Sequence, residues 1–213
     1  MKYYEMHYCS FVDKTKFLYI PNVPDLSVFK DYIAKNHNDN FTIGWIGSIR
    51  YKSQMKNLIF LSEKCKIHLF IAGYEDGSNE IQNICVKRKN ITWFGPYSYD
   101  KDIVSLYEKC DVIYAVYDAN LINERIALPN KLYEAIICEL PIIVSKGTYL
   151  SEIVNELKIG ISVNCEDVSE LEEAVNLMKI NYDFYKNNCI KEKRHFDLFE
   201  YNDSLIKRIE EWF

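Results

Sequence analysis

Apolar residues follow two alternating patterns between residues 41 and 180. Short β-branched runs indicate buried strands, and apolar residues three and four positions apart indicate helices. The runs predict strands at 41–46, 67–72, 91–94, 112–117, 142–144 and 160–163, and helices at 51–64, 79–87, 100–109, 130–139, 149–156 and 168–180. Strand and helix alternating about six times indicates an α/β fold, a doubly wound parallel sheet of Rossmann-like type with helices on both faces.

The two ends of the chain lack this alternation. A strand candidate at 17–20 leads into the turn-forming Pro21-Asn22-Val23-Pro24, and a weak helix follows at 26–34. The tail carries apolar residues among many charges, which indicates helices. We therefore predict an interdomain linker or remnant at 1–40, a Rossmann-like domain at 41–180, and C-terminal helices packed on that domain at 181–213.

The segment LPNKLYEAIICELPIIVS, residues 128–145, predicts a helix followed by a core strand. In its first turn Asn130, Lys131 and Glu134 present an amide, a cation and a carboxylate along one edge. The helix N-terminus adds unpaired N–H groups and partial positive charge. This corner suits a ligand that carries both phosphates and hydroxyls. The alternative is a surface ion pair between Lys131 and Glu134.

Small and charged residues follow several of the predicted strands. In an open parallel sheet ligands bind beyond the carboxyl ends of the strands, where helix N-termini and loops converge. Five of the seven glycines fall at this edge. The alternative is that these glycines serve turn geometry alone. We favour a phosphate and sugar site there, formed by residues that follow the strands or open the 130–139 helix: Gly47, Ser48, Arg50, Gly73, Gly95, Pro96, Tyr97, Asn130, Lys131 and Glu134.

Composition excludes several other classes. The net charge of −5 argues against general nucleic-acid binding, which needs a basic face. Seven cysteines without a CxxC pair indicate reduced thiols and a cytoplasmic location. The four histidines never come within metal-ligand spacing of one another, so we predict no metal. No apolar run reaches the roughly 18 residues of a membrane span. The chain also lacks GxGxxG and GxxxxGK[ST].

Several runs occur in an order that resembles a known family: GWIGSIR, IAG, ITWFGPYSYDKDIVSLYEKCDVIYAVYD, LPNKLYEAIICELPIIVS and IGISV. They resemble the C-terminal, donor-binding domain of group 1 (family 4-like) glycosyltransferases of the GT-B fold, over residues 17–213. Such enzymes are retaining and build capsular polysaccharide, lipopolysaccharide and related glycans. The resemblance implies sugar transfer from a nucleotide-diphosphate sugar to a glycan or lipid-linked acceptor, without a metal or other cofactor.

The same resemblance implies roles for individual residues. Arg50 corresponds to the basic residue that contacts the donor diphosphate, and Lys131 is assigned a phosphate or sugar contact. Glu134 corresponds to the second glutamate of a Glu-x7-Glu motif, which accepts hydrogen bonds from ribose hydroxyls. Residues 95–97 fall where the nucleobase rests.

Two departures from the family pattern set the open questions. The first glutamate of the motif falls at Ile126, although Glu124 is near. The acceptor-binding half is absent, so we expect this chain to bind donor and to need that domain, or a partner subunit, for transfer. The apolar tail leaves self-association or peripheral association with the inner face of the membrane open.

Two other functions remain as alternatives. One is a noncatalytic nucleotide-binding or scaffolding domain, which the Ile126 departure favours. The other is a nucleotide-sugar epimerase of similar architecture, which also needs two domains.

Overall fold

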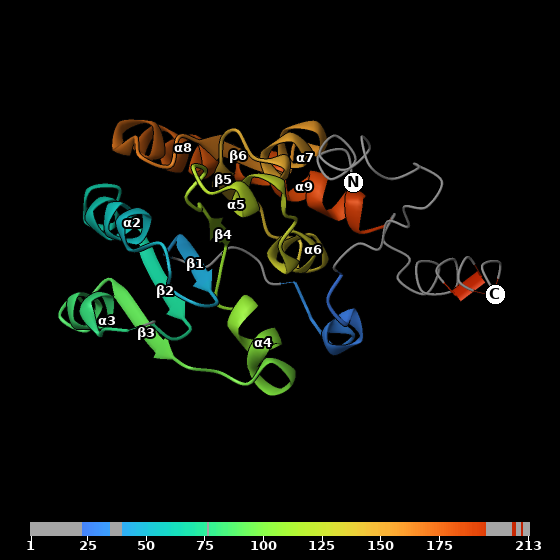
Figure 1. Cartoon of the computed structure of the whole chain (residues 1–213), viewed down its shortest axis with the longest axis horizontal. Helices are drawn as coiled ribbons and strands as arrows, with labels where there is room; N and C mark the ends of the chain where they lie inside the picture. The colour runs from blue at the N-terminus through green and yellow to red at the C-terminus, as the bar shows by residue number, and fades with distance from the viewer. Residues whose placement is uncertain (1–22, 35–39, 76, 195–205, 208–209, 211–213) are drawn as a thin grey trace.

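The protein, described here by a computed structural model, is an α/β domain built on one parallel sheet (Figure 1). The structure describes residues 23–34, 40–75, 77–194, 206, 207 and 210. The sheet has six strands in the order β3-β2-β1-β4-β5-β6. Their bounds are β1 Thr42–Ile46, β2 His68–Ala72, β3 Ile91–Gly95, β4 Val112–Ala115, β5 Ile142–Ser145 and β6 Gly160–Val163.

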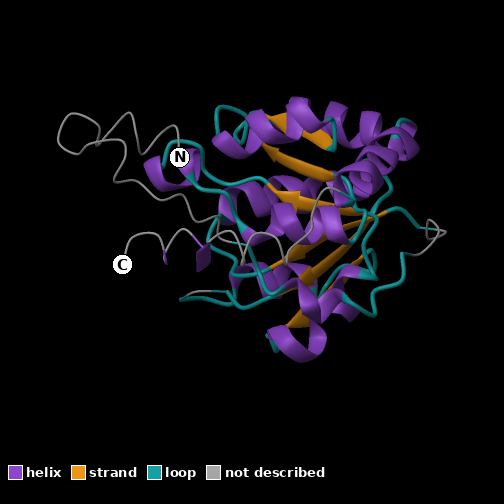
Figure 2. Ribbon diagram, turned by 90° about the vertical axis from the view of Figure 1, so that its right-hand side faces the viewer, coloured by secondary structure: helices purple, strands orange, loops and turns teal. Residues whose placement is uncertain are grey.

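Helices cover both faces of this sheet (Figure 2). On one side α2 contacts α3 and α8, and on the other α6 contacts α9 and the short 3-10 helix η2. The chain order from β1 outward to β3 and then back to β4 is the arrangement of a doubly wound sheet. The helices are η2 Leu26–Phe29, α2 Lys52–Lys64, α3 Glu80–Cys85, α4 Tyr99–Tyr107, α5 Ile122–Ile126, α6 Asn130–Ile137, α7 Tyr149–Leu157, α8 Val168–Ile180 and α9 Tyr182–Lys193.

The sequence pattern predicted this architecture, including all six strands, and two helix predictions were wrong. The helix expected at 26–34 is only the four-residue η2, where the Asp25 carboxylate accepts a hydrogen bond from the Ser27 N–H. The helix α5 lies in a stretch interpreted as loop; it has five residues and none is buried, so it leaves no apolar period to detect. The strand predicted at 17–20 lies outside the described residues, as does most of the tail beyond Arg194.

Residues 23–34, predicted to belong to a linker, pack against the domain. Phe29 is buried, and its ring meets the edge of Tyr107 in α4 at 5.8 Å between centroids. The Tyr32 hydroxyl donates to the Cys138 carbonyl at the end of α6, at 2.9 Å. This segment therefore buttresses the two helices α4 and α6.

The core is continuous across the sheet, and both faces of the central strands are buried. β1 and β4 are buried at every position, as expected for parallel strands between two helix layers. The six cysteines in the described part of the chain are buried and free. None of the helices described here has the length and apolar character needed to cross a membrane.

Gly44 and Cys110 provide a test of this packing. A Cβ added to Gly44 in β1 would lie 2.2 Å from the Cys110 Sγ, so we expect Gly44→Ala to lower the free energy of unfolding by about 1–3 kcal/mol. Cys110→Ala removes the colliding atom, so the double variant should lose less stability than the two single variants summed. Urea unfolding of all four proteins measures this coupling; strictly additive losses would contradict the packing described here.

Candidate functional site

Three adjacent strands end in glycines with positive φ: Gly47 after β1, Gly73 after β2 and Gly95 at the end of β3. The Gly47 N–H donates to the Ala72 carbonyl and the Gly73 N–H to the Gly95 carbonyl, both at 2.8 Å, so the three turns stay in register. A Cβ on Gly73 would lie 1.9 Å from the Gly47 oxygen. Turn geometry alone therefore explains Gly73.

At Gly47 the space for a side chain is taken by a different neighbour. A Cβ there would lie 2.8 Å from the Nζ of Lys131, at the start of α6. That ammonium also lies 5.4 Å from the ring centroid of Trp45 and 5.7 Å from that of Tyr117. The Trp45 indole N–H donates to the Gly47 carbonyl at 3.1 Å, which fixes the ring. The Lys131 ammonium thus lies near two aromatic rings and against a residue that has no side chain.

Burial lowers the pKa of Lys131 from its ordinary 10.5 to about 8, and the nearby carboxylates of Glu134 and Glu124 act in the opposite direction. Among the described residues no oxygen accepts a hydrogen bond from its ammonium and no carboxylate pairs with it. A desolvated cation without an acceptor favours the binding of an anion.

Two more polar groups in the loop after β1 also lack a partner among the described residues. The Ser48 hydroxyl oxygen is buried and has no hydrogen-bond partner. Arg50 is exposed, and within the described part of the chain its guanidinium makes no hydrogen bond or ion pair. A hydroxyl, a guanidinium and an ammonium around a glycine turn can together hold a phosphate group.

Glu134, one turn further along α6, is buried and accepts two phenolic hydrogen bonds. The Tyr99 hydroxyl donates to Oε1 at 2.7 Å, and the Tyr107 hydroxyl donates to Oε2 at 2.5 Å. Only 4% of Glu134 is exposed. The surface ion pair with Lys131, the alternative considered from the sequence, is therefore not what the structure forms.

The remaining predicted site residues surround Glu134 and the start of its helix. Tyr97 is half-buried, and burial together with the Glu134 charge raises its pKa to about 12. Pro96 is exposed beside it, whereas Gly95 is buried. Asn130, the first residue of α6, is half-buried. The Glu134 charge thus acts on Tyr97, and the nucleobase and ribose roles assigned to these two residues stay predictions.

The three charged residues predicted to meet at one rim share this edge of the sheet but do not contact one another. Lys131 faces the Gly47 turn, Glu134 faces the tyrosines of the β3–α4 region, and Arg50 is exposed to solvent. No hydrogen bond or ion pair joins the three. A ligand that contacts all of them must span from the β1 turn to the β3–α4 region.

Sequence reasoning missed the aromatic side of the site. Tyr51 lies 5.1 Å from the Tyr117 ring, and its pKa is raised by burial and by a hydrogen bond to Glu124 of α5. Trp45, within the strand predicted at 41–46, is buried, and the Lys131 ammonium lies over its ring. The strand pattern shows that such a residue is buried but cannot show which neighbour covers it.

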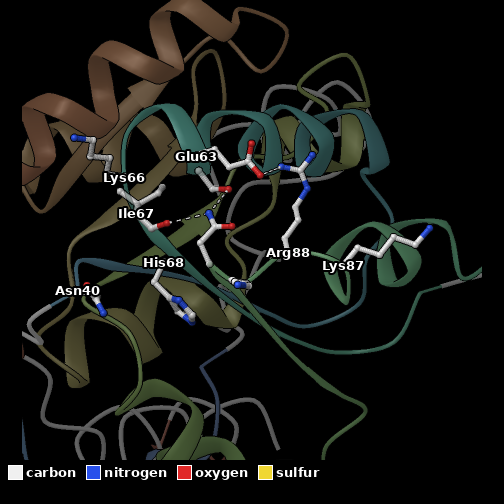
Figure 3. Close-up of a pocket in the computed structure, with 10 residues that line it drawn as sticks. Asn40, Glu63, Lys66, Ile67, His68, Lys87 and Arg88 are labelled. Carbon is white, nitrogen blue, oxygen red and sulfur yellow. Dashed lines mark hydrogen bonds and ion pairs between the residues drawn. The ribbon is translucent and has the colours of Figure 1, made fainter.

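A separate pocket of about 620 Å³ lies at the opposite, amino-terminal edge of β2 and β3 (Figure 3). Its polar centre is satisfied internally, because the Asn90 amide donates to the Ser62 hydroxyl and the Ile67 carbonyl. Arg88 pairs with Glu63, and Lys66 and Lys87 point outward (Figure 3). The described residues contain no group of three or more His, Cys, Asp or Glu able to hold a metal ion.

The family model for glycosyl transferases group 1 matches residues 30–196. The chain therefore belongs to the group 1 glycosyltransferases. A comparison with curated proteins finds no match.

Solved structures share the fold at low sequence identity. WaaG, a glycosyltransferase of lipopolysaccharide biosynthesis, superimposes with a TM-score of 0.67 at 14% identity over 95% of this chain and 58% of its own. Anabaena HepE, solved with UDP and glucose, gives 0.63 at 14% identity over 81% and 49%. The C-terminal domain of LpcC from Francisella tularensis gives 0.53 at 15% identity over 86% and 95%.

These figures define what portion of a relative this chain represents. It spans about half the length of WaaG and HepE, but nearly all of an isolated C-terminal domain. The fold is therefore that of the C-terminal half of a GT-B glycosyltransferase.

The environment of Lys131 can be tested by titration. We expect its ammonium to lose a proton near pH 8, well below the pKa of 10.5 of an ordinary lysine side chain. Carbon-13 NMR of labelled lysine side chains would follow the Cε resonance, with Lys131→Arg identifying the signal. Glu124→Gln should lower the midpoint further, because the carboxylate that stabilises the ammonium is removed. A midpoint near 10.5 in the wild-type protein would show that the ammonium is hydrated and not held between the rings.

Proposed function

We propose that this chain is the donor-binding domain of a glycosyltransferase, which binds a nucleotide-diphosphate sugar at the carboxyl edge of β1–β3. The observation that supports it most is Lys131, a desolvated ammonium that no described residue accepts from, which lies against the Gly47 turn. The next residue of that turn, Ser48, has a buried hydroxyl that is also without a partner among the described residues. Family membership and the UDP and glucose bound by HepE agree with this ligand class.

The proposed chemistry is neutralisation of a departing diphosphate. When the sugar–phosphate bond breaks, negative charge builds on the phosphate oxygen. Lys131 and Arg50 supply positive charge there, and the N-terminus of α6 adds the partial positive charge of its helix dipole. Glu134 accepts from the ribose hydroxyls at the other end, with Tyr97 against the base. In this scheme a metal is not required, and the anomeric configuration is retained.

The acceptor belongs to a second domain or a partner subunit in this proposal. The chain spans about half the length of WaaG and HepE. Leu121 and Ile122, at the start of α5, are 50% and 74% exposed, an apolar surface suited to contact with that second half. We propose a glycan or lipid-linked acceptor in surface polysaccharide biosynthesis, such as capsule or lipopolysaccharide, at the cytoplasmic face of the membrane.

A second candidate is a nucleotide-binding domain that no longer catalyses transfer. It is favoured by Ile126, which stands where the family motif has its first glutamate, and is half-buried in α5. Glu124 lies two residues away and acts on Lys131 electrostatically. Binding of sugar nucleotide without transfer, even with the acceptor domain supplied, would favour this candidate.

Calorimetry with UDP, GDP and their sugars tests donor binding. We expect micromolar binding of one nucleotide by the wild-type chain and its loss in Glu134→Ala, because a buried acceptor for the ribose hydroxyls is removed. Lys87→Ala, at the opposite edge, is the matched control and should bind like wild type. If the wild-type chain bound none of these nucleotides, a scaffolding role would replace the proposed one.

Arg50 can be examined separately from the ribose contacts. Because no described residue pairs with its guanidinium, Arg50→Ala should weaken the affinity for a nucleoside diphosphate by roughly 10- to 100-fold and the affinity for the matching nucleoside by little. Arg88→Ala removes a partly exposed guanidinium, paired with Glu63 at the opposite edge of the sheet, and serves as control. Equal losses for the diphosphate and the nucleoside would remove Arg50 from the phosphate role.

A further inference from the structure

Glu134 has acceptor capacity that its protein partners do not fill. An ionised carboxylate offers about four lone-pair positions. Among the described residues, the Tyr99 hydroxyl occupies one position on Oε1 and the Tyr107 hydroxyl one position on Oε2. Each oxygen therefore keeps a position for one further donor, in a residue that is only 4% exposed. Two neighbouring hydroxyls on one ligand match that arrangement.

The two tyrosines hold the carboxylate from different sides. Tyr107 is fully buried at the end of α4, and its ring orientation is fixed by the edge contact with Phe29. Tyr99, at the start of α4, is half-buried and lies toward the surface with Tyr97. Burial and the Glu134 charge raise the pKa of both phenols, so both keep their protons and act as donors at neutral pH.

Their effect is to fix the direction of the remaining lone pairs. A carboxylate on a flexible side chain can turn to suit many ligands, whereas one clamped at both oxygens cannot. A ligand hydroxyl that meets it gains a bond to a charged acceptor, and an analogue that lacks the hydroxyl leaves a buried acceptor position empty.

We propose that Tyr107 and Tyr99 are positioning residues that clamp Glu134 so that it selects ribonucleotides over deoxyribonucleotides through the ribose diol. This inference rests on the proposed donor-binding function. It assigns a role to the two tyrosines that donate hydrogen bonds to Glu134, and neither the sequence motif nor the family match specifies that role.

The test compares UDP with 2′-deoxy-UDP by calorimetry in four proteins: wild type, Tyr107→Phe, Tyr99→Phe and Tyr32→Phe. GDP and its 2′-deoxy form replace them if the chain binds guanine nucleotides. Tyr32→Phe is the matched control. It removes the part-buried hydrogen bond from the Tyr32 hydroxyl to the Cys138 carbonyl, at the end of the same helix α6, and leaves the hydrogen bonds of Glu134 in place. Melting temperatures of all variants measure any general loss of structure.

We expect the wild-type chain to prefer the ribonucleotide by about tenfold or more, the value of one hydrogen bond to a charged acceptor. Tyr107→Phe and Tyr99→Phe should each lower that ratio to less than about threefold, and Tyr32→Phe should preserve it. A lost structural contact would weaken both nucleotides together and leave the ratio unchanged. Tyr99→Phe, at a half-buried position, carries the test if Tyr107→Phe does not fold.

The outcomes separate this inference from the function on which it rests. Ribonucleotide binding with an unchanged ratio in both tyrosine variants would overturn the clamp and leave donor binding intact. Equal wild-type affinity for the ribo and deoxy forms would do the same. Failure of the wild-type chain to bind any nucleoside diphosphate would overturn the proposed function together with the clamp.

Discussion

The desolvated ammonium of Lys131 is the constraint around which this edge of the molecule is built. Its charge lies over two aromatic rings and against a residue that has no room for a side chain. Burying a cation without a paired carboxylate is unfavourable, and the pKa of about 8 expresses that penalty. An anion that pairs with this ammonium would offset that penalty, and the phosphate of the proposed donor is such an anion.

The fold brings the necessary groups together from distant parts of the chain. Parallel pairing of β1 with β2 and of β2 with β3 aligns the three glycine turns at one edge. The connection from β4 through α5 then returns α6 to the same edge, with Lys131 and Glu134 on its first two turns. The positive charges lie toward β1 and the carboxylate toward β3. A ligand with phosphates at one end and hydroxyls at the other matches that polarity.

Much of the fold and part of the candidate site could be predicted from the sequence, for identifiable reasons. Buried parallel strands are near-continuous apolar runs, so their positions and the doubly wound class of the sheet could be predicted, although the order of the strands was not. The segment around Pro129 placed Lys131 and Glu134 on one helix start. What could not be predicted was the partner of each side chain. Glu134 was expected to offer its carboxylate openly, whereas Tyr99 and Tyr107 hold it, and those residues belong to an element 27 and 35 positions away.

The hydrophobic pattern also could not predict that residues near the amino end pack against the domain. Phe29 and Tyr32 occur in a stretch with turn-forming residues and weak periodicity, so they were assigned to a linker. Their rings nevertheless stabilise α4 and α6, the two helices that carry the clamp on Glu134. Single aromatic residues carry no period, so only the three-dimensional structure reveals such contacts.

The central claim is that the ligand binds at the carboxyl edge of β1–β3. The most direct measurement is the crystal structure of this chain with a bound nucleoside diphosphate. The account predicts the phosphates between the Gly47 turn and Lys131, with the ribose at Glu134. Density for the nucleotide in the basic pocket at the opposite edge, lined by Lys66, Lys87 and Arg88, would contradict it.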